Sequence, residues 1–457
     1  MKQPAAMLGF VLVGGAYVSF ASECQAQTMG NILVIVADDL GKELLSIYDT
    51  PTTQRAKTPN IDRLAERGVV FNNFWGYPLS APVRAAMLTG RYGHHTSIVN
   101  LDITLPLEEK TLFEALPDSY TNALIGKWHL SRDTNFAPDY GIDYFAGIAM
   151  GGGVRDYYNW QLTENGKTTN CTEYSTTKIT DLAKGWIEKQ DSEWVCWVAY
   201  NAPHTPYHIP PKGTYSGKLK KSADEMANNP LPYFIAMTES MDYEIGRLLE
   251  SVDDNTTIIF VGDNGTENKA LQSPYPSRHG KGTLYEAGVS VPLVVCGKGV
   301  SQQGTRCDAL ISSVDIFPTV MELSGKMMSQ YEDSFSFASA LQGGDGQRTF
   351  NFSEINNQRS GYMNAVSDGR YKIITQKGKT TMLFDLAEDP LEMKNLIGGE
   401  LSQAEAAALE RLEGELKRMN IPEIAAAENK NMGNNRPQGG NRPQMRNNST
   451  TQNRVRQ

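Results

Sequence analysis

The sequence has few cysteines, and their spacing excludes the common cysteine-based sites. Among 457 residues there are five, with no Cys-x-x-Cys pair and no Cys/His pattern of the kind that binds zinc. Two of them, Cys196 and Cys296, lie in apolar runs, which favours buried thiols over a disulfide.

An excess of positive charge is also missing. Lysine and arginine number 43 against 52 aspartates and glutamates, and the net charge of -9 argues against a nucleic-acid surface. Hydrophobic residues make up 40% and charged residues 21%, which is ordinary globular composition. Because 457 residues are too many for one ordinary core, we expect a large domain and a smaller one.

Charge is almost absent from the N-terminus. Lys2 is the only charged side chain before Glu23, and a run of apolar and small residues lies between them. This pattern predicts a signal peptide at residues 1–27 and an exported protein, periplasmic or secreted, with no stable membrane insertion after cleavage. A retained anchor is the alternative, but the run contains Gly14 and Gly15 and is barely long enough to span a bilayer.

Apolar runs that alternate with helical patterns predict an α/β fold, with a mainly parallel or mixed sheet between helices. NILVIVAD at residues 31–38 is a continuous apolar run, typical of a strand covered on both faces. Further strand candidates are residues 122–125, 194–200, 257–262 and 291–297. Helical patterns occur at residues 58–68, where Thr58 precedes Pro59, and along residues 237–252.

The C-terminal third has a different character. Short strand-like segments and a helix near residues 402–419 predict a smaller α+β subdomain at 346–424, after a catalytic domain at 28–345. Residues 425–457 are rich in Asn, Gln and Arg and have almost no large apolar side chain. This composition predicts a disordered tail.

Oxygen-bearing side chains follow two of the predicted strands. Asp38 and Asp39 end the first strand, and Asp263 and Asn264 follow the strand at 257–262. Ligands bind at the carboxyl edge of parallel sheets, and hard cations prefer such oxygen ligands. A helix cap or a solvated turn would explain the aspartate pair alone equally well.

Three further motifs, around Ser80, Lys127 and Lys281, complete this set of polar residues. Ser80 precedes a short helix that Pro82 starts and Gly90 ends, so it sits where backbone NH groups favour negative charge, with Arg84 one turn later. A simple helix cap is the alternative for Ser80.

Lys127 and His129 follow another predicted strand and are two residues apart, so an extended segment directs both to one face. Glycines on both sides of Lys281 let the backbone place that lysine against an anion. Each of these residues taken alone has an ordinary structural explanation.

Together these motifs resemble the formylglycine-dependent sulfatases of the alkaline-phosphatase superfamily. The resemblance covers residues 31 to about 396. It includes the modification motif Ser80-x-Pro82-x-Arg84, TPNIDRLAERGVVF, GKWHL, Pro203-His204-x-Pro206, FVGDNG, GKGTLYEAGVSVPLVV, SSVDIFPTVMELSG and LFDLAEDPLEMKNL. Two positions depart from the common pattern, because Ser80 replaces the usual cysteine and Val83 the usual serine.

The resemblance implies a cofactor and a mechanism. One divalent metal ion, calcium or alternatively magnesium, would be bound by Asp38, Asp39, Ser80, Asp263 and Asn264. A radical-SAM maturase would oxidise Ser80 to formylglycine, whose gem-diol attacks sulfur and then expels sulfate.

The same resemblance implies roles for the remaining residues. Arg84 and His129 would position the diol, Lys127 and Lys281 would neutralise the sulfuryl oxygens, and His204 would protonate the leaving alcohol. The sequence leaves open which of these two roles belongs to His129 and which to His204.

The expected substrate is a sulfated carbohydrate or an aryl sulfate. Candidates for a sugar subsite are His94, His95, Arg132, Asp133, Arg278 and His279, with Tyr157, Tyr158 and Trp160 for stacking. Two other functions stay open. One is a phosphomonoesterase or phosphodiesterase with Ser80 as direct nucleophile, and the other is an inactive relative that binds sulfated glycans.

Overall fold

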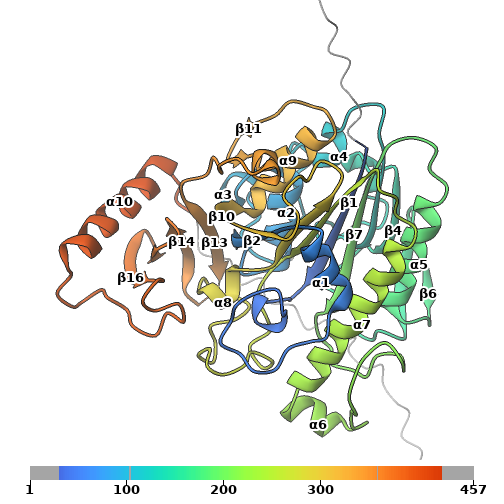
Figure 1. Ribbon diagram of the computed structural model, residues 1–457, viewed down its shortest axis with the longest axis horizontal. Helices are drawn as coiled ribbons and strands as arrows, with labels where there is room; N and C mark the ends of the chain where they lie inside the picture. The colour runs from blue at the N-terminus through green and yellow to red at the C-terminus, as the bar shows by residue number, and fades with distance from the viewer. Residues whose placement is uncertain (1–29, 102–103, 358, 425–457) are drawn as a thin grey trace, which may run out of the picture.

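A ten-stranded mixed sheet forms the centre of the chain in the computed structural model, which describes residues 30–101, 104–357 and 359–424 (Figure 1). Its strand order is β10-β2-β9-β8-β1-β7-β3-β4-β5-β6. The strands are β1 (Asn31–Asp38), β2 (Gly68–Trp75), β3 (Thr121–Lys127), β4 (Tyr144–Ile148), β5 (Trp160–Glu164), β6 (Lys167–Cys171), β7 (Trp194–Pro203), β8 (Thr256–Gly262), β9 (Leu293–Gly297) and β10 (Thr305–Ser312).

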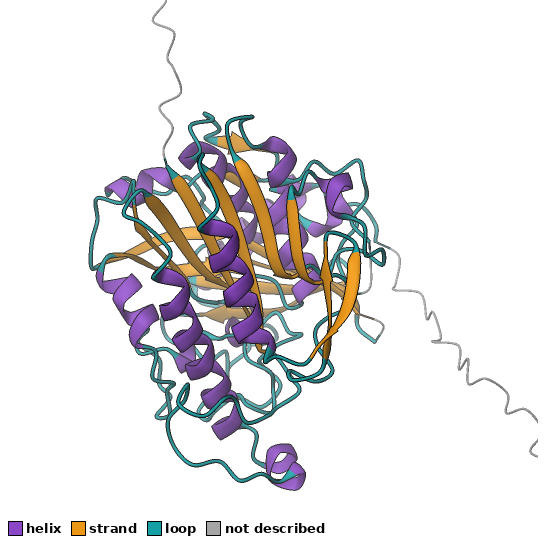
Figure 2. Cartoon of the chain, turned by 90° about the vertical axis from the view of Figure 1, so that its right-hand side faces the viewer, coloured by secondary structure: helices purple, strands orange, loops and turns teal. Residues whose placement is uncertain are grey.

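Helices cover both faces of this sheet (Figure 2). The pleat of β1 shows why, since Leu33 and Ile35 pack into one apolar cluster and Val34 and Val36 into another. The first cluster includes α1 (Pro59–Glu66), α5 (Ser175–Ile187) and α7 (Leu231–Leu249), and the second includes α2 (Ser80–Thr89), α4 (Leu112–Ala115) and α9 (Ile316–Leu323). The other helical segments are α3 (Gly93–Thr96), α6 (Ala223–Asn228), α8 (Glu286–Val289), η1 (Lys42–Leu44), η2 (Ala137–Tyr140), η3 (Ser313–Asp315) and η4 (Ala338–Gln342).

The direction of the strands places four carboxyl ends side by side. β8, β1, β7 and β3 are neighbours and run parallel to one another. β9 runs antiparallel to both β8 and β2, so β2 has the same direction as the central four strands. The sheet is therefore mixed with a parallel centre, as predicted.

A second, smaller unit follows along the chain. Its antiparallel sheet consists of β13 (Asn351–Asn357), β14 (Gly361–Ser367), β15 (Tyr371–Gln376) and β16 (Lys379–Asp385), and α10 (Gln403–Met419) packs beside it. Ser402 and Glu405 form a capping box at the start of α10, which explains where this helix begins. The short strands β11 (Gln330–Tyr331) and β12 (Ser334–Phe335) precede the unit. The predicted C-terminal α+β subdomain is confirmed.

Several sequence predictions can be compared with these elements. Each predicted strand occurs, although the run at 291–297 contributes only β9 and does so antiparallel, and α7 ends before Val252. Cys196 and Cys296 are buried free thiols, as expected. The predicted signal peptide and tail lie outside the described residues. Within the described chain, no helix is long and apolar enough to cross a membrane.

Candidate active site

Four parallel strands deliver polar side chains to one edge of the sheet. Asp38 is the last residue of β1 and Lys127 the last of β3, while Asp263 follows β8 and His204 follows β7. Because β8, β1, β7 and β3 are adjacent, residues up to 225 positions apart in sequence meet here.

Acidic and amide groups form the floor of the site. Asp38, Asp39, Asp263 and Asn264 are each at most 1% exposed. Asp263 Oδ1 accepts hydrogen bonds from the backbone N–H of Asp39 at 3.0 Å and of Asn264 at 2.7 Å. Asn264 Nδ2 donates to Asp39 Oδ1 at 2.7 Å. Asp39 has a φ of 72°, so the chain turns at the end of β1 and both aspartates reach the same centre.

Ser80 faces this acidic floor from the first turn of α2. Its Oγ lies 2.8 Å from Asp38 Oδ1 and 3.0 Å from Asn264 Oδ1, and its side chain is buried. α2 ends at Gly90, which adopts a φ of 68°, as expected for a glycine C-cap. Leu79, and not Ser80, precedes the helix, so Ser80 belongs to the helix itself and its hydroxyl makes no capping bond.

Three cations surround the floor. Lys127 Nζ lies 2.5 Å from Asp38 Oδ2, Lys281 Nζ lies 2.6 Å from Asp39 Oδ1, and Arg84 donates to Asp263 Oδ2 at 3.1 Å. Arg84 also donates to the carbonyl of Lys127 at 3.0 Å, which links α2 to β3. The site therefore contains an interleaved set of buried charges.

The carboxylates differ in how well their charge is compensated. Burial raises the pKa of Asp38, but Lys127, His204 and Arg84 outweigh burial and hold this pKa well below its ordinary value. Burial and the negative charge of Asp38 raise the pKa of Asp263 to about 7. Negative charge at Asp263 is thus incompletely neutralised by the side chains alone.

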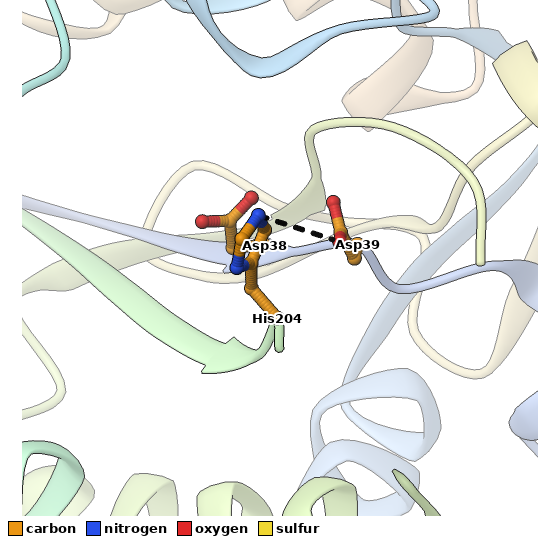
Figure 3. A group of neighbouring side chains, drawn as sticks. All are labelled: Asp38, Asp39 and His204. Atoms are coloured by element: carbon orange, nitrogen blue, oxygen red, sulfur yellow. Dashed lines mark ion pairs between the residues drawn. The ribbon is translucent and has the colours of Figure 1, made fainter. Parts of the chain in front are cut away.

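Two histidines approach from neighbouring parallel strands, His129 after β3 and His204 after β7. His204 Nδ1 donates to the carbonyl of Thr205 at 2.7 Å, and its Nε2 faces Asp39 Oδ2 at 3.8 Å (Figure 3). Burial, followed by Lys127 and Arg84, lowers the pKa of His129 to about 2. The imidazole of His129 is therefore neutral, and its buried Nδ1 has no hydrogen-bond partner within the described part of the chain.

These residues fit a hard divalent cation. Asp38, Asp39, Asp263, Asn264 and Ser80 all present oxygen atoms, and the elevated pKa of Asp263 marks a place where added positive charge would stabilise the site. Asp38, Asp39 and His204 also place one ligand atom each within 4.8 Å of one another (Figure 3). In the described residues, no other group of three acidic, histidine or cysteine side chains does so.

Comparison with known families decides what kind of site this is. The sulfatase family model matches residues 30–326, which include every residue of the candidate site. The chain belongs to the sulfatase family. A second model, that of the N-sulphoglucosamine sulphohydrolase C-terminal region, matches residues 278–420. The resemblance predicted from the motifs is confirmed.

Individual sulfatases are related to this chain at low identity. Arylsulfatase J of Mus musculus is 28% identical over 324 residues, which cover 64% of this chain and 52% of that protein. The chain thus spans about half the length of that relative.

Solved structures share the fold. The crystal structure of Ps i-CgsB in complex with k-i-k-neocarrahexaose has a TM-score of 0.72 at 24% identity, and the match covers 87% of this chain and 94% of that one. The structure of BT4656 in complex with its substrate D-glucosamine-2-N,6-O-disulfate has a TM-score of 0.71 at 20% identity, and the match covers 86% of this chain and 98% of that one. These likenesses confirm the predicted fold class.

The residues predicted for a sugar subsite differ in their burial and in their contacts. His94 is buried and bonds to Glu354 at 3.1 Å, and His279 stacks on Tyr285 with ring centroids 3.6 Å apart. Of the three aromatic candidates, Tyr157 and Trp160 are buried, whereas Tyr158 is 39% exposed.

The sequence analysis did not predict that the glycine run at residues 151–153 packs against His129 and His204. A Cβ atom on Gly152 would lie 3.1 Å from the ring of His129, and one on Gly153 would lie 3.4 Å from His204 Nδ1. Backbone without side chains therefore covers both imidazoles. The three consecutive glycines at 151–153 are the signal that could have revealed this.

Proposed function

We propose that this chain hydrolyses organic sulfate monoesters, with Ser80 as the precursor of formylglycine and one bound calcium ion. The observation that carries the proposal is the position of Ser80 Oγ, between Asp38 Oδ1 at 2.8 Å and Asn264 Oδ1 at 3.0 Å. The aldehyde hydrate and the cation would supply a nucleophilic hydroxyl and its activation. Magnesium would also suit this oxygen set.

Each charged side chain then has a task. Asp38, Asp39, Ser80, Asp263 and Asn264 would hold the cation. Lys127 and Lys281 pair with Asp38 and Asp39, and they would neutralise the sulfuryl oxygens of the substrate. Arg84 keeps Asp263 and the end of β3 in place and orients the nucleophile.

The two histidines have different roles. His129 is neutral and its Nδ1 has no hydrogen-bond partner among the described residues, so it can accept a hydrogen bond from a hydroxyl of the matured residue and orient it. His204 is less enclosed, with its side chain 22% exposed, and its Nε2 is not held by a backbone group. We therefore propose that His204 protonates the leaving oxygen and that His129 acts on the nucleophile.

The proposed substrate is a sulfated carbohydrate, with aryl sulfates as simple surrogates. Solved neighbours carry an oligosaccharide in one case and a disulfated glucosamine in the other. Export through the predicted signal peptide and maturation by a radical-SAM enzyme complete the proposal. The phosphatase alternative is less well supported, because the described residues offer one metal cluster and no evident second one.

Mass spectrometry and a substrate pair test this proposal. Protein produced with a serine-type maturase should show a Ser80 peptide lighter by two hydrogens and should cleave 4-nitrophenyl sulfate much faster than 4-nitrophenyl phosphate. Unmatured protein and the Ser80→Ala variant are the controls. Steady phosphate turnover by unmatured protein, together with no sulfate cleavage by the matured form, would make Ser80 a phosphatase nucleophile.

A further inference from the structure

A buried lysine of the C-terminal sheet lies between two glutamates from different segments. Lys372, on β15, has a fully buried side chain. Its Nζ lies 2.9 Å from Glu286 Oε1 and 2.9 Å from Glu392 Oε1. Glu286 belongs to α8 of the catalytic domain and Glu392 to the segment after β16, so these charges connect the two units.

This cluster is attached to the segment that carries Lys281. The carboxylate of Glu392 also accepts a hydrogen bond of 2.5 Å from the backbone N–H of Glu286, at the start of α8. We call residues 278–289 the Lys281 loop. His279 in the loop stacks on Tyr285, and Tyr285 packs against Phe384 of β16 with ring centroids 6.0 Å apart. The C-terminal sheet therefore contacts the Lys281 loop through charges and through aromatic rings.

The same lysine touches the segment before Ser80. Lys372 Nζ lies 4.8 Å above the ring of Trp75, the last residue of β2. The backbone N–H of Gly282, next to Lys281, donates to the carbonyl of Pro78 at 2.9 Å. Lys372 therefore contacts the Lys281 loop and also the segment before Ser80. The hydrogen bond from Gly282 to Pro78 joins these same two segments.

Apolar packing encloses the lysine of this cluster. Trp75, Leu284 and Val289 of the catalytic domain form one core with Ile374 and Phe384 of the C-terminal sheet. Burial opposes the charge of Lys372, but Glu286 and Glu392 outweigh it and raise the pKa of this lysine above its ordinary value. A charged group in such surroundings needs both partners in fixed positions, which makes the cluster a geometric constraint.

We propose that Lys372 is a positioning residue for the active site, because it clamps the Lys281 loop and the Trp75 segment to the C-terminal sheet through Glu286 and Glu392. The C-terminal subdomain would in this way set the distance between Lys281 and the matured Ser80. This inference rests on the proposed sulfatase function for its kinetic consequence, whereas the clamp itself is a property of the fold.

The test uses three variants of the full matured chain. Lys372→Met removes the charge, Lys372→Arg keeps it, and Arg348→Met is the matched control. Arg348 is also buried and pairs with Asp315 near the start of the C-terminal sheet, and none of its hydrogen bonds reaches the Lys281 loop. Melting temperature, kcat and KM for 4-nitrophenyl sulfate, inhibition by inorganic sulfate, and hydrogen–deuterium exchange of the 278–289 peptide are measured for each.

We expect Lys372→Met to weaken sulfate inhibition and to lower kcat/KM at least tenfold beyond Arg348→Met, with faster exchange confined to residues 278–289 and the 75–79 segment. Lys372→Arg should recover most of the sulfate inhibition and most of the kcat/KM. The proposal is overturned if two results are found together. The losses of activity in Lys372→Met and Arg348→Met follow their losses in melting temperature, and residues 278–289 exchange hydrogen at the same rate in both variants. If Lys372→Met does not fold, Glu392→Gln takes its place. Inactive wild-type protein would reject the proposed function, yet the exchange comparison would still decide whether the clamp exists.

Discussion

Ser80 Oγ lies 2.8 Å from Asp38 Oδ1, although 42 residues separate the two in sequence. The contact joins the first residue of α2 to the last residue of β1. Both residues lie at the same edge of the sheet. Under the proposed function, this contact would hold the residue to be modified against a ligand of the cation.

Asp263 supports both the metal site and the fold around it. Asp263→Ala removes the acceptor of two backbone N–H groups and the nearest carboxylate of the buried Arg84, so we expect loss of activity and a destabilisation of about 3–5 kcal/mol. Asp263→Asn keeps an oxygen acceptor and should be inactive but clearly more stable than the alanine variant. Urea unfolding and 4-nitrophenyl sulfate turnover check both expectations. Near-normal activity of the asparagine variant would remove Asp263 from the ligand set.

Removing the cation should affect stability as well as rate. The floor contains three carboxylates, and the pKa of Asp263 is raised to about 7 by burial and by Asp38. Protein treated with a chelator should therefore lose activity and melt at a lower temperature, and added calcium should restore both. Dialysed, metal-free protein that turns over sulfate esters at a normal rate would contradict the metal assignment.

The neutral state of His129 predicts a particular acid sensitivity. Burial lowers its pKa from 6.5 to about 2, so below pH 6.5 the unfolded chain takes up a proton that the folded chain does not. This histidine should therefore reduce the free energy of unfolding as the pH falls, by roughly 2 kcal/mol at pH 5 relative to neutral pH. His129→Gln should show a smaller loss of stability between pH 7 and pH 5 than the wild type.

His95 provides the opposite control. A hydrogen bond to Asp333 raises the pKa of His95, so its contribution to stability is present at low pH and disappears as the pH rises through that pKa. His95→Gln should therefore lose more stability than the wild type on acidification. Equal pH dependence for His129→Gln and the wild type in urea titrations would mean that His129 is charged in the folded protein.

Tyr158 is the aromatic candidate that a sugar can reach. It is 39% exposed, and its hydroxyl donates to the carbonyl of Ile209 at 2.9 Å, which holds the ring in place. Tyr158→Ala should raise KM for a sulfated oligosaccharide about three- to tenfold and leave 4-nitrophenyl sulfate unaffected. Tyr243, 47% exposed on α7, is the matched control. An equal change for both substrates would exclude a stacking role.

Much of the fold could be predicted because its signals are local. β1 occupies the predicted residues 31–38, because a continuous apolar run of that length is typical of a strand covered on both faces. Ser402 and Glu405 mark the start of α10 through a capping bond that spans three residues. Strands β2, β4, β5, β6 and β10 were not predicted, because these segments are shorter or more polar and depend on their neighbours for burial.

By itself, the sequence determined the residue types of the site and the fact that each follows a strand or starts a helix. Only the tertiary structure decided which strands are adjacent, because pairing between residues more than 150 positions apart depends on the packing of whole elements and leaves no local pattern. The left-handed backbone at Asp39 and His129 has the same origin, since the surrounding contacts hold a conformation that neither residue prefers. The contact of Lys372 with the Lys281 loop likewise exists only once the C-terminal sheet packs against the catalytic domain.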